Sequence, residues 1–148
     1  MVAISQLSRS SDGCKFFCTR KSQIATIIKE VFTIAQEKQF ENKIKSYLKE
    51  RECYVVKYFA NRMTKSGVPD LLCSVNGYFV AVEVKASNGR PSELQKYNIK
   101  QIQIDGGVAI ILYPEQFELF KELINALIAG NEFDAWQIEN RINERWLK

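Results

Sequence analysis

The sequence contains no histidine among its 148 residues. A Ser-His-Asp triad, a Cys-His pair, a two-histidine zinc site and a histidine general base all need an imidazole ring, so all four kinds of site are excluded. Any catalysis by this chain must therefore use carboxylates, lysine, tyrosine, cysteine or a bound metal ion.

The sequence also has neither a zinc-binding cysteine motif nor a long hydrophobic run. Its four cysteines, Cys14, Cys18, Cys53 and Cys73, form no CxxC pair. Cys53 and Cys73 fall in or beside apolar runs, where we expect buried free thiols, whereas Cys14 and Cys18 could share one helix face. The longest apolar run, residues 108–113, is far too short to cross a bilayer, and residues 1–11 lack the apolar centre of a signal peptide. These absences predict a cytoplasmic protein without a membrane partner.

The basic residues are concentrated in the middle of the chain. The net charge is only +4, but residues 41–100 carry eleven basic and six acidic side chains, whereas residues 101–148 carry four and eight. This distribution indicates one electropositive surface rather than a uniformly basic protein.

The hydrophobic pattern changes its period along the chain. Residues 1–21 show no period and are expected to form an arm of uncertain order, while Ser22 is suited to cap one long bent helix, or the first of two, reaching Leu48. Strands are predicted at 54–59, 70–75, 78–85 and 108–113, and helices at 92–104, at 114–130 and in the acidic tail. We therefore expect a core domain over 22–130 and a C-terminal helical extension over 131–148.

Asn76 and Gly77 separate two apolar runs and predict a two-residue type I′ hairpin turn. Pairing outward from that turn places Asp70 directly opposite Glu83, with Cβ atoms roughly 5 Å apart. Lys85 lies on the same face because side chains alternate along a strand. Two facing carboxylates repel each other, and a divalent cation that prefers oxygen ligands, Mg²⁺ or Mn²⁺, would remove that repulsion.

An ordinary solvent-exposed strand face is the alternative explanation for these charges. Lys85 would then simply neutralise one acid, and no function would follow. However, strand 78–85 begins with apolar residues on both faces, which is typical of a strand covered on both sides. Charges are costly in such a strand and usually functional, so the pattern favours a site.

Three short motifs follow one another in the central part of the chain. They are Ser66-Gly67-Val68-Pro69-Asp70, Val82-Glu83-Val84-Lys85 and Ser92-Glu93-Leu94-Gln95. In order and spacing they resemble the PD-(D/E)XK nuclease superfamily, and within it the VRR-NUC group and the archaeal-type Holliday junction resolvases, over residues 41–111. The resemblance implies an α/β, restriction-endonuclease-like fold, in which helices flank a central mixed β-sheet.

The resemblance also implies a role for each residue of the central constellation. Asp70 and Glu83 would hold a catalytic Mg²⁺ ion together with the main-chain carbonyl of Val84, and Mn²⁺ would also support activity. Lys85 would orient or activate the attacking water. These roles need no histidine, in agreement with the composition.

Two further residues are expected near the metal. An acidic residue of the preceding helix often completes such a site, and Glu41 is the expected one, ahead of Glu50 and Glu52. The family places a glutamine where Gln95 stands. Ser92 and Gln95 also have the spacing of a capping box, which is the alternative role for the same side chain.

The sequence thus predicts a metal-dependent endonuclease that hydrolyses DNA. Arg62, Lys65, Arg90 and Lys100 are expected to contact phosphates. No base-reading module is apparent, so we expect recognition by shape. The resemblance further implies a phage or mobile-element type of enzyme that recognises branched or flapped DNA, such as a Holliday junction, as a homodimer or higher homo-oligomer. The alternatives are a sequence-specific restriction or homing-type endonuclease on the same fold, and a catalytically idle nucleic-acid-binding or protein-interaction module.

Overall fold

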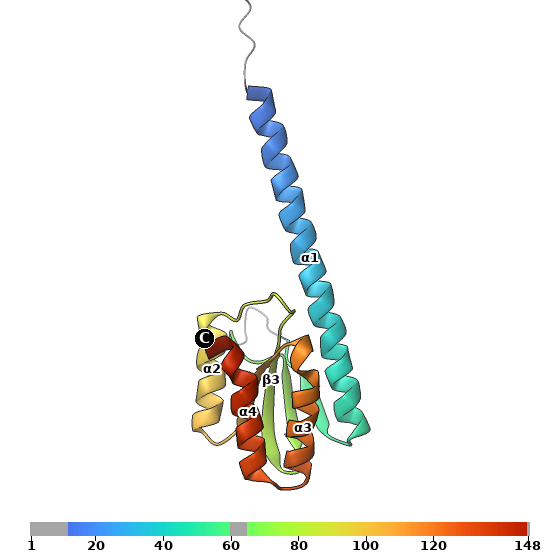
Figure 1. Ribbon diagram of the computed structural model, residues 1–148, viewed down its shortest axis with the longest axis vertical. Helices are drawn as coiled ribbons and strands as arrows, with labels where there is room; N and C mark the ends of the chain where they lie inside the picture. The colour runs from blue at the N-terminus through green and yellow to red at the C-terminus, as the bar shows by residue number, and fades with distance from the viewer. Residues whose placement is uncertain (1–11, 60–64, 148) are drawn as a thin grey trace, which may run out of the picture. The chain divides into compact units, whose positions relative to one another are not determined.

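The computed structural model describes residues 12–59 and 65–147, with the side chains of the first helix described from residue 23. The chain divides into two units, Met1–Phe32 and Thr33–Lys148. The first unit contains the beginning of helix α1, and the second holds a β-sheet with its covering helices (Figure 1). Across 12–59 and 65–147, no helix combines the length and the apolar character needed to cross a membrane.

A four-stranded mixed sheet forms the centre of the second unit. The strands lie in the order β1, β2, β3, β4, with antiparallel pairing from β1 to β3 and parallel pairing of β3 with β4. The elements are α1 Asp12–Glu50, β1 Tyr54–Lys57, β2 Leu71–Val75, β3 Tyr78–Val84, α2 Glu93–Ile104, β4 Val108–Leu112, the 3-10 turn η1 Pro114–Gln116, α3 Phe117–Ile128 and α4 Glu132–Leu147. The predicted fold class, a mixed sheet flanked by helices, is confirmed.

The hairpin of β2 and β3 has the predicted register. Val75 pairs with Tyr78, and Leu71 pairs with Val82. The loop residues Asn76 and Gly77 have φ angles of 48° and 87°, the positive values that a type I′ turn needs at both positions. This register fixes which side chains near the open ends of the two strands share one face of the sheet.

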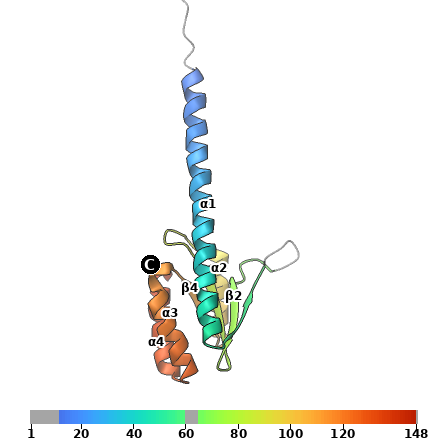
Figure 2. The ribbon, with the colours of Figure 1, turned by 90° about the vertical axis from the view of Figure 1, so that its right-hand side faces the viewer.

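Helices cover both faces of the sheet, and α3 and α4 lie side by side (Figures 1 and 2). On one face, Leu48 of α1 and Phe120 of α3 belong with Val82 to the larger core cluster. On the other face, Ile99 of α2 packs in a second cluster with Ala81. Strand β3 is consequently buried on both sides from its third residue onward, as its alternating pattern predicted.

Helix α1 begins earlier than the sequence pattern predicted. It runs without a break from Asp12 to Glu50, so the predicted start at Ser22 is wrong, and the predicted arm 1–21 is helical from residue 12. Extending an existing helix adds one hydrogen bond for each residue fixed and needs no hydrophobic period, which explains the difference. The rest of the predicted arm, residues 1–11, lies outside the described residues.

Helix α4 covers the outer edge of the sheet at β4. Among the described strands, β4 pairs with β3 alone, which leaves main-chain groups on its other side. Glu139 Oε1 accepts a hydrogen bond from Ala109 N at 2.9 Å; Asn143 accepts one from Ile111 N at 3.2 Å and donates one to Ala109 O at 2.9 Å. An uncovered edge strand invites aggregation, and α4 covers this one. Helix α4 therefore packs as part of the second unit, whereas the sequence pattern set residues 131–148 apart as an extension.

Candidate active site

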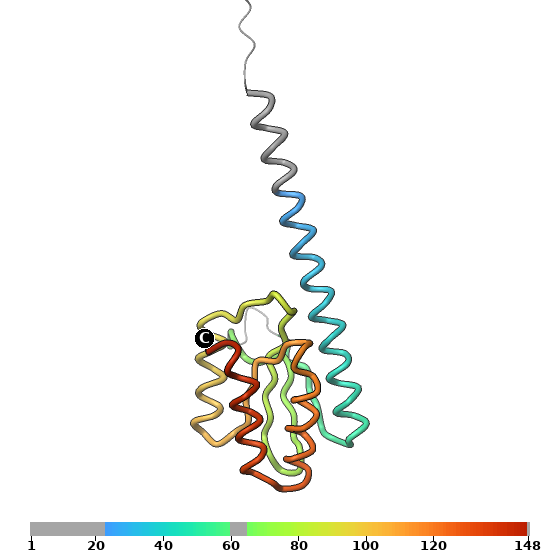
Figure 3. The backbone as a smooth tube through the Cα atoms, viewed as in Figure 1, coloured from blue at the N-terminus to red at the C-terminus, as the bar shows by residue number. Residues whose placement is uncertain are grey.

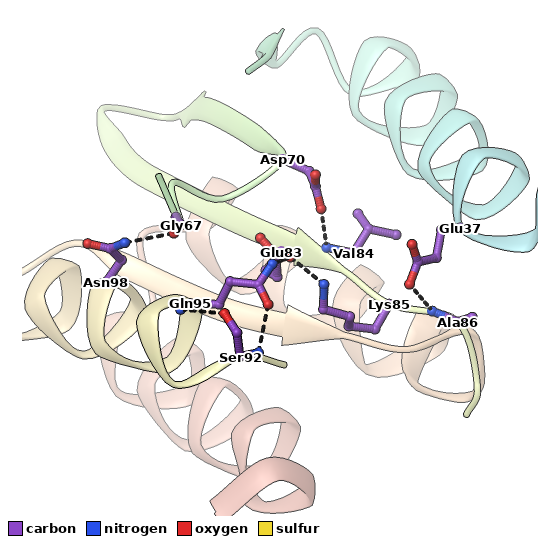
Figure 4. Close-up of polar contacts among 10 residues, drawn as sticks. All are labelled: Glu37, Gly67, Asp70, Glu83, Val84, Lys85, Ala86, Ser92, Gln95 and Asn98. Atoms are coloured by element: carbon purple, nitrogen blue, oxygen red, sulfur yellow. Dashed lines mark hydrogen bonds and ion pairs between the residues drawn. The ribbon is translucent and has the colours of Figure 1, made fainter. Parts of the chain in front are cut away.

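Asp70, Glu83 and Lys85 come together where the β2–β3 hairpin opens (Figure 4). Asp70 immediately precedes β2, and its Oδ2 accepts a hydrogen bond from Val84 N at 2.9 Å. Lys85 immediately follows β3, and its Nζ lies 2.6 Å from Glu83 Oε1. The hairpin register produces this arrangement, so the predicted closeness of the three side chains is present in the structure.

Glu83 is a buried carboxylate in an unfavourable electrostatic environment. Only 2% of the residue is exposed. Burial, followed by the neighbouring Asp70 carboxylate, raises the pKa of Glu83 from 4.5 to about 7, although the ammonium of Lys85 acts in the opposite direction. A positive charge placed beside this acid would therefore stabilise its ionised form.

Gln95 makes contacts that fit both of the roles that the sequence presented as alternatives. Its Oε1 accepts a hydrogen bond from Ser92 N at 2.9 Å, and Ser92 Oγ accepts one from Gln95 N at 3.3 Å, which makes a complete capping box at the start of α2. Its Nε2 donates to Glu83 Oε1. Because the amide has a separate donor and acceptor, one side chain can cap the helix and contact the buried carboxylate at once.

Helix α2 also holds the loop that leads to Asp70. Asn98 is buried, and its Nδ2 donates to the carbonyls of Ser66 at 3.3 Å and Gly67 at 2.8 Å. Gly67 has a φ of +74°, and a Cβ at this position would lie 2.6 Å from Leu94 Cγ, so the close approach requires glycine. Gly67 belongs to a motif visible in the sequence, whereas no sequence signal marks Asn98, whose contact depends on the tertiary fold.

Glu41, the acidic residue that α1 was expected to contribute to the site, is paired with two lysines. It forms ion pairs with Lys45 at 2.8 Å and with Lys57 at 2.7 Å. Burial opposes its ionisation, but the hydrogen bonds and charges of both lysines hold the pKa of Glu41 below its usual value. These contacts account for Glu41 as the centre of an ion-pair cluster that joins α1 to β1.

A second carboxylate of α1, Glu37, lies beside the predicted site. Its Oε1 accepts a hydrogen bond from Ala86 N at 3.1 Å, directly after Lys85 in the chain (Figure 4). Its negative charge is also one of the causes that raise the pKa of Glu83. Sequence reasoning missed Glu37 because Glu37 and Glu41 stand one helical turn apart, and only the packing of α1 on the sheet distinguishes them.

Three of the four basic residues expected to contact DNA lie in the described part of the chain. Lys65, Arg90 and Lys100 are all exposed, whereas Arg62 lies outside the described residues. Arg90 lines a pocket of about 820 Å³ together with Lys96 of α2. This pocket includes the loop that follows Lys85, so it adjoins the candidate site along the chain.

The donor set fits a hard divalent cation. Asp70 and Glu83 offer two carboxylates whose mutual repulsion contributes to the raised pKa of Glu83. Among the described residues, no three His, Cys, Asp or Glu side chains form a group arranged to hold a metal ion. Mg²⁺ commonly uses only one or two protein carboxylates and takes its remaining ligands from water and substrate phosphates, so a pair is sufficient.

The mixed sheet, with two carboxylates and a lysine at the open end of one hairpin, is the arrangement expected of a PD-(D/E)XK nuclease. The model of the archaeal Holliday junction resolvase (Hjc) family matches residues 33–139. Because this match covers more than half of the chain, the chain belongs to that family, and the superfamily predicted from the sequence is confirmed. No curated protein and no solved structure matched the chain.

Proposed function

We propose that this protein is a Mg²⁺-dependent endonuclease that cuts branched DNA, with Asp70, Glu83 and Lys85 as its catalytic residues. The supporting observation is the buried Glu83 carboxylate beside Asp70 and Lys85 in a chain of the Holliday junction resolvase family. Mn²⁺ would support the same reaction, since it also accepts oxygen ligands.

Each residue of the site would have a distinct task in phosphodiester hydrolysis. Asp70, Glu83 and the main-chain carbonyl of Val84 would hold the cation, which supplies an activated water and stabilises negative charge on the phosphate. The Lys85 ammonium would orient the attacking water and add a second positive charge near the phosphate. Gln95 would keep the Glu83 carboxylate in a fixed orientation through the hydrogen bond from its Nε2.

The carboxylate that α1 contributes to the site is, in this proposal, Glu37 rather than Glu41. Glu37 accepts the hydrogen bond of Ala86 N and thereby fixes the chain next to Lys85. Glu41 stays a prediction from the sequence, and its ion pairs with two lysines support a structural role instead.

DNA binding in this proposal depends on phosphate contacts rather than base contacts. The exposed Lys65, Arg90 and Lys100 would contribute salt-dependent affinity that varies little with sequence. Selection of a junction would then depend on the shape of the DNA. Because resolution of a four-stranded junction requires two cuts, we also propose a homodimer or higher homo-oligomer as the active form.

A panel of labelled substrates tests this function. Four-way junctions, flaps, linear duplexes and single strands of DNA, with a matched RNA duplex, are incubated with the protein in Mg²⁺ or Mn²⁺, and with the Lys85→Ala variant in parallel. We expect cleavage of the four-way junction by the unmodified protein and a rate lower by roughly 100-fold or more in the variant. Uniform cutting of every substrate would indicate a general nuclease, a fixed sequence at each cut would indicate a restriction-type enzyme, and binding without cleavage would indicate an idle module.

A further inference from the structure

Helix α1 carries a large apolar surface in the part that precedes the resolvase match. Five side chains between residues 24 and 32 are each 56% to 63% exposed, at Ile24, Ile27, Ile28, Val31 and Phe32. The helix segment that carries them belongs to the first unit of the chain, and its backbone is blue in the tube of Figure 3. The family match begins only at residue 33, so the nuclease fold does not account for this surface.

The spacing of these residues places them on one side of the helix. At 3.6 residues per turn, the five side chains span an arc of about 140°. Thr26, Lys29 and Glu30 occupy the opposite half. Ile24, Ile27 and Val31 are separated by three and four residues, and Ile34 continues the series in the sequence, which is the a and d pattern of helices that pack against each other.

The charge of this segment favours a protein partner over a polyanion. Residues 22–36 contain one lysine and one glutamate and therefore have no net charge. Helices that lie on anionic membranes carry an excess of lysine and arginine on the polar face, and DNA-binding helices also depend on basic residues. Residues 22–36 have neither feature, and the basic residues Lys15, Arg20 and Lys21 stand before this segment in the same helix.

The identical helix of another copy has the matching apolar surface. Burying five such side chains on each of two copies would remove on the order of 1,000 Å² from water, at about 100 Å² per side chain, which lies near the lower limit for a specific interface. We infer that the face formed by Ile24, Ile27, Ile28, Val31 and Phe32 packs against the same face of a second copy of this chain. This contact would be one interface of the homo-oligomer proposed above, but it does not depend on the proposed nuclease chemistry.

Sedimentation equilibrium of the full chain across the micromolar range tests the inference. The double variant Ile24→Glu, Val31→Glu places two charges at the centre of the apolar face. The matched control, Thr26→Glu with Thr33→Glu, places the same two charges one heptad apart on the opposite side. Far-UV circular dichroism is recorded for each protein so that loss of helix is distinguished from loss of association.

We expect the unmodified protein and the control to sediment as multiples of 17.1 kDa. The Ile24→Glu, Val31→Glu variant should keep its helix signal, and its dissociation constant should rise about tenfold or more, because each buried charge is costly. If the unmodified protein stayed at 17.1 kDa over the whole concentration range, the inference would be overturned. Binding of that monomer to phosphatidylglycerol vesicles would then indicate that the apolar face contacts a membrane instead. Equal association of the variant and the unmodified protein would overturn it as well, since another surface would then be responsible.

Discussion

Gln95 illustrates how one side chain can link local structure to a site. Its oxygen bonds Ser92 N within the capping box, while its nitrogen contacts Glu83. The sequence presented the two roles of Gln95 as alternatives, because the capping box and the family motif use the same position. Their coexistence depends on how far α2 stands from β3, which local spacing does not determine.

Substitutions at the capping box should separate helix stability from catalysis. Gln95→Leu removes the contact with Glu83, so the junction cleavage rate should fall by roughly 10-fold to 100-fold. Ser92→Ala removes only the Ser92 hydroxyl and should lower the free energy of unfolding by about 1 kcal/mol while cleavage stays within about threefold. Urea unfolding and single-turnover cleavage measure the two effects. Equal loss of cleavage in both variants would show that Gln95 acts only through the helix cap.

Glu83 should make the metal-free protein less stable as the pH rises. Its pKa is about 7 in the folded state against an ordinary value of 4.5, so the folded state binds this proton more tightly. Its stabilising contribution is complete below about pH 4.5 and is lost as the pH rises through about 7. With EDTA present, Glu83→Gln should raise the free energy of unfolding by roughly 3 kcal/mol at about pH 8, at 1.36 kcal/mol per pKa unit, and by little at about pH 5. An equal increase in the free energy of unfolding at both pH values would contradict the conclusion that Glu83 is a buried carboxylate with a raised pKa.

At the scale of elements, local chemistry predicted some features well. The Asn76-Gly77 pair specified its turn and register without outside information, because a type I′ turn needs two residues that tolerate positive φ. The start of α2 at Ser92 followed from its capping box in the same way. The sequence could not predict which carboxylate of α1 lies beside the site. Glu37 and Glu41 stand one turn apart on an unbroken helix, and tertiary packing decides between them.

The two carboxylates of α1 should respond differently to neutralisation. Glu37→Gln keeps an acceptor for Ala86 N but removes the negative charge, and junction cleavage should fall by roughly 10-fold to 100-fold. Glu41→Gln leaves Lys45 and Lys57 without their ionised partner, so it should lower the free energy of unfolding with cleavage changed by less than about threefold. Single-turnover rates and urea unfolding check both. The reverse order of the two cleavage rates would restore Glu41 as the residue of the site.

Covering of the β4 edge by α4 should be a measurable source of stability. Asn143→Leu leaves Ile111 N without its side-chain acceptor and removes one of the two side-chain donors to Ala109 O, the other being Gln103 Nε2 at 3.1 Å. The free energy of unfolding should fall by roughly 2 to 4 kcal/mol. Asn140→Leu makes the same chemical change on the exposed side of α4 and should have an effect within about 0.5 kcal/mol. Urea unfolding monitors both variants. Equal stability of the two would mean that α4 does not protect the edge of the sheet.

At the scale of the whole molecule, the resolvase match and the second unit begin at the same residue, Thr33. The active-site candidates all belong to this unit, and the apolar face of α1 precedes it. The absence of histidine is consistent with the proposed active site, since acids and one lysine around a divalent cation suffice for phosphodiester hydrolysis. No periodicity in the sequence could predict the covering of β4 by α4, because these contacts join residues more than thirty positions apart.

The catalytic assignment depends most directly on Asp70. The decisive measurement is the single-turnover rate at which a labelled four-way junction is cut in Mg²⁺ by the unmodified protein, by Asp70→Asn, and by the exposed control Glu93→Gln. The account predicts that Asp70→Asn, folded by circular dichroism, still binds the junction in EDTA but cuts it at least roughly 100-fold more slowly, while Glu93→Gln stays within about threefold. A folded Asp70→Asn protein that cuts the junction as fast as the unmodified one would contradict it.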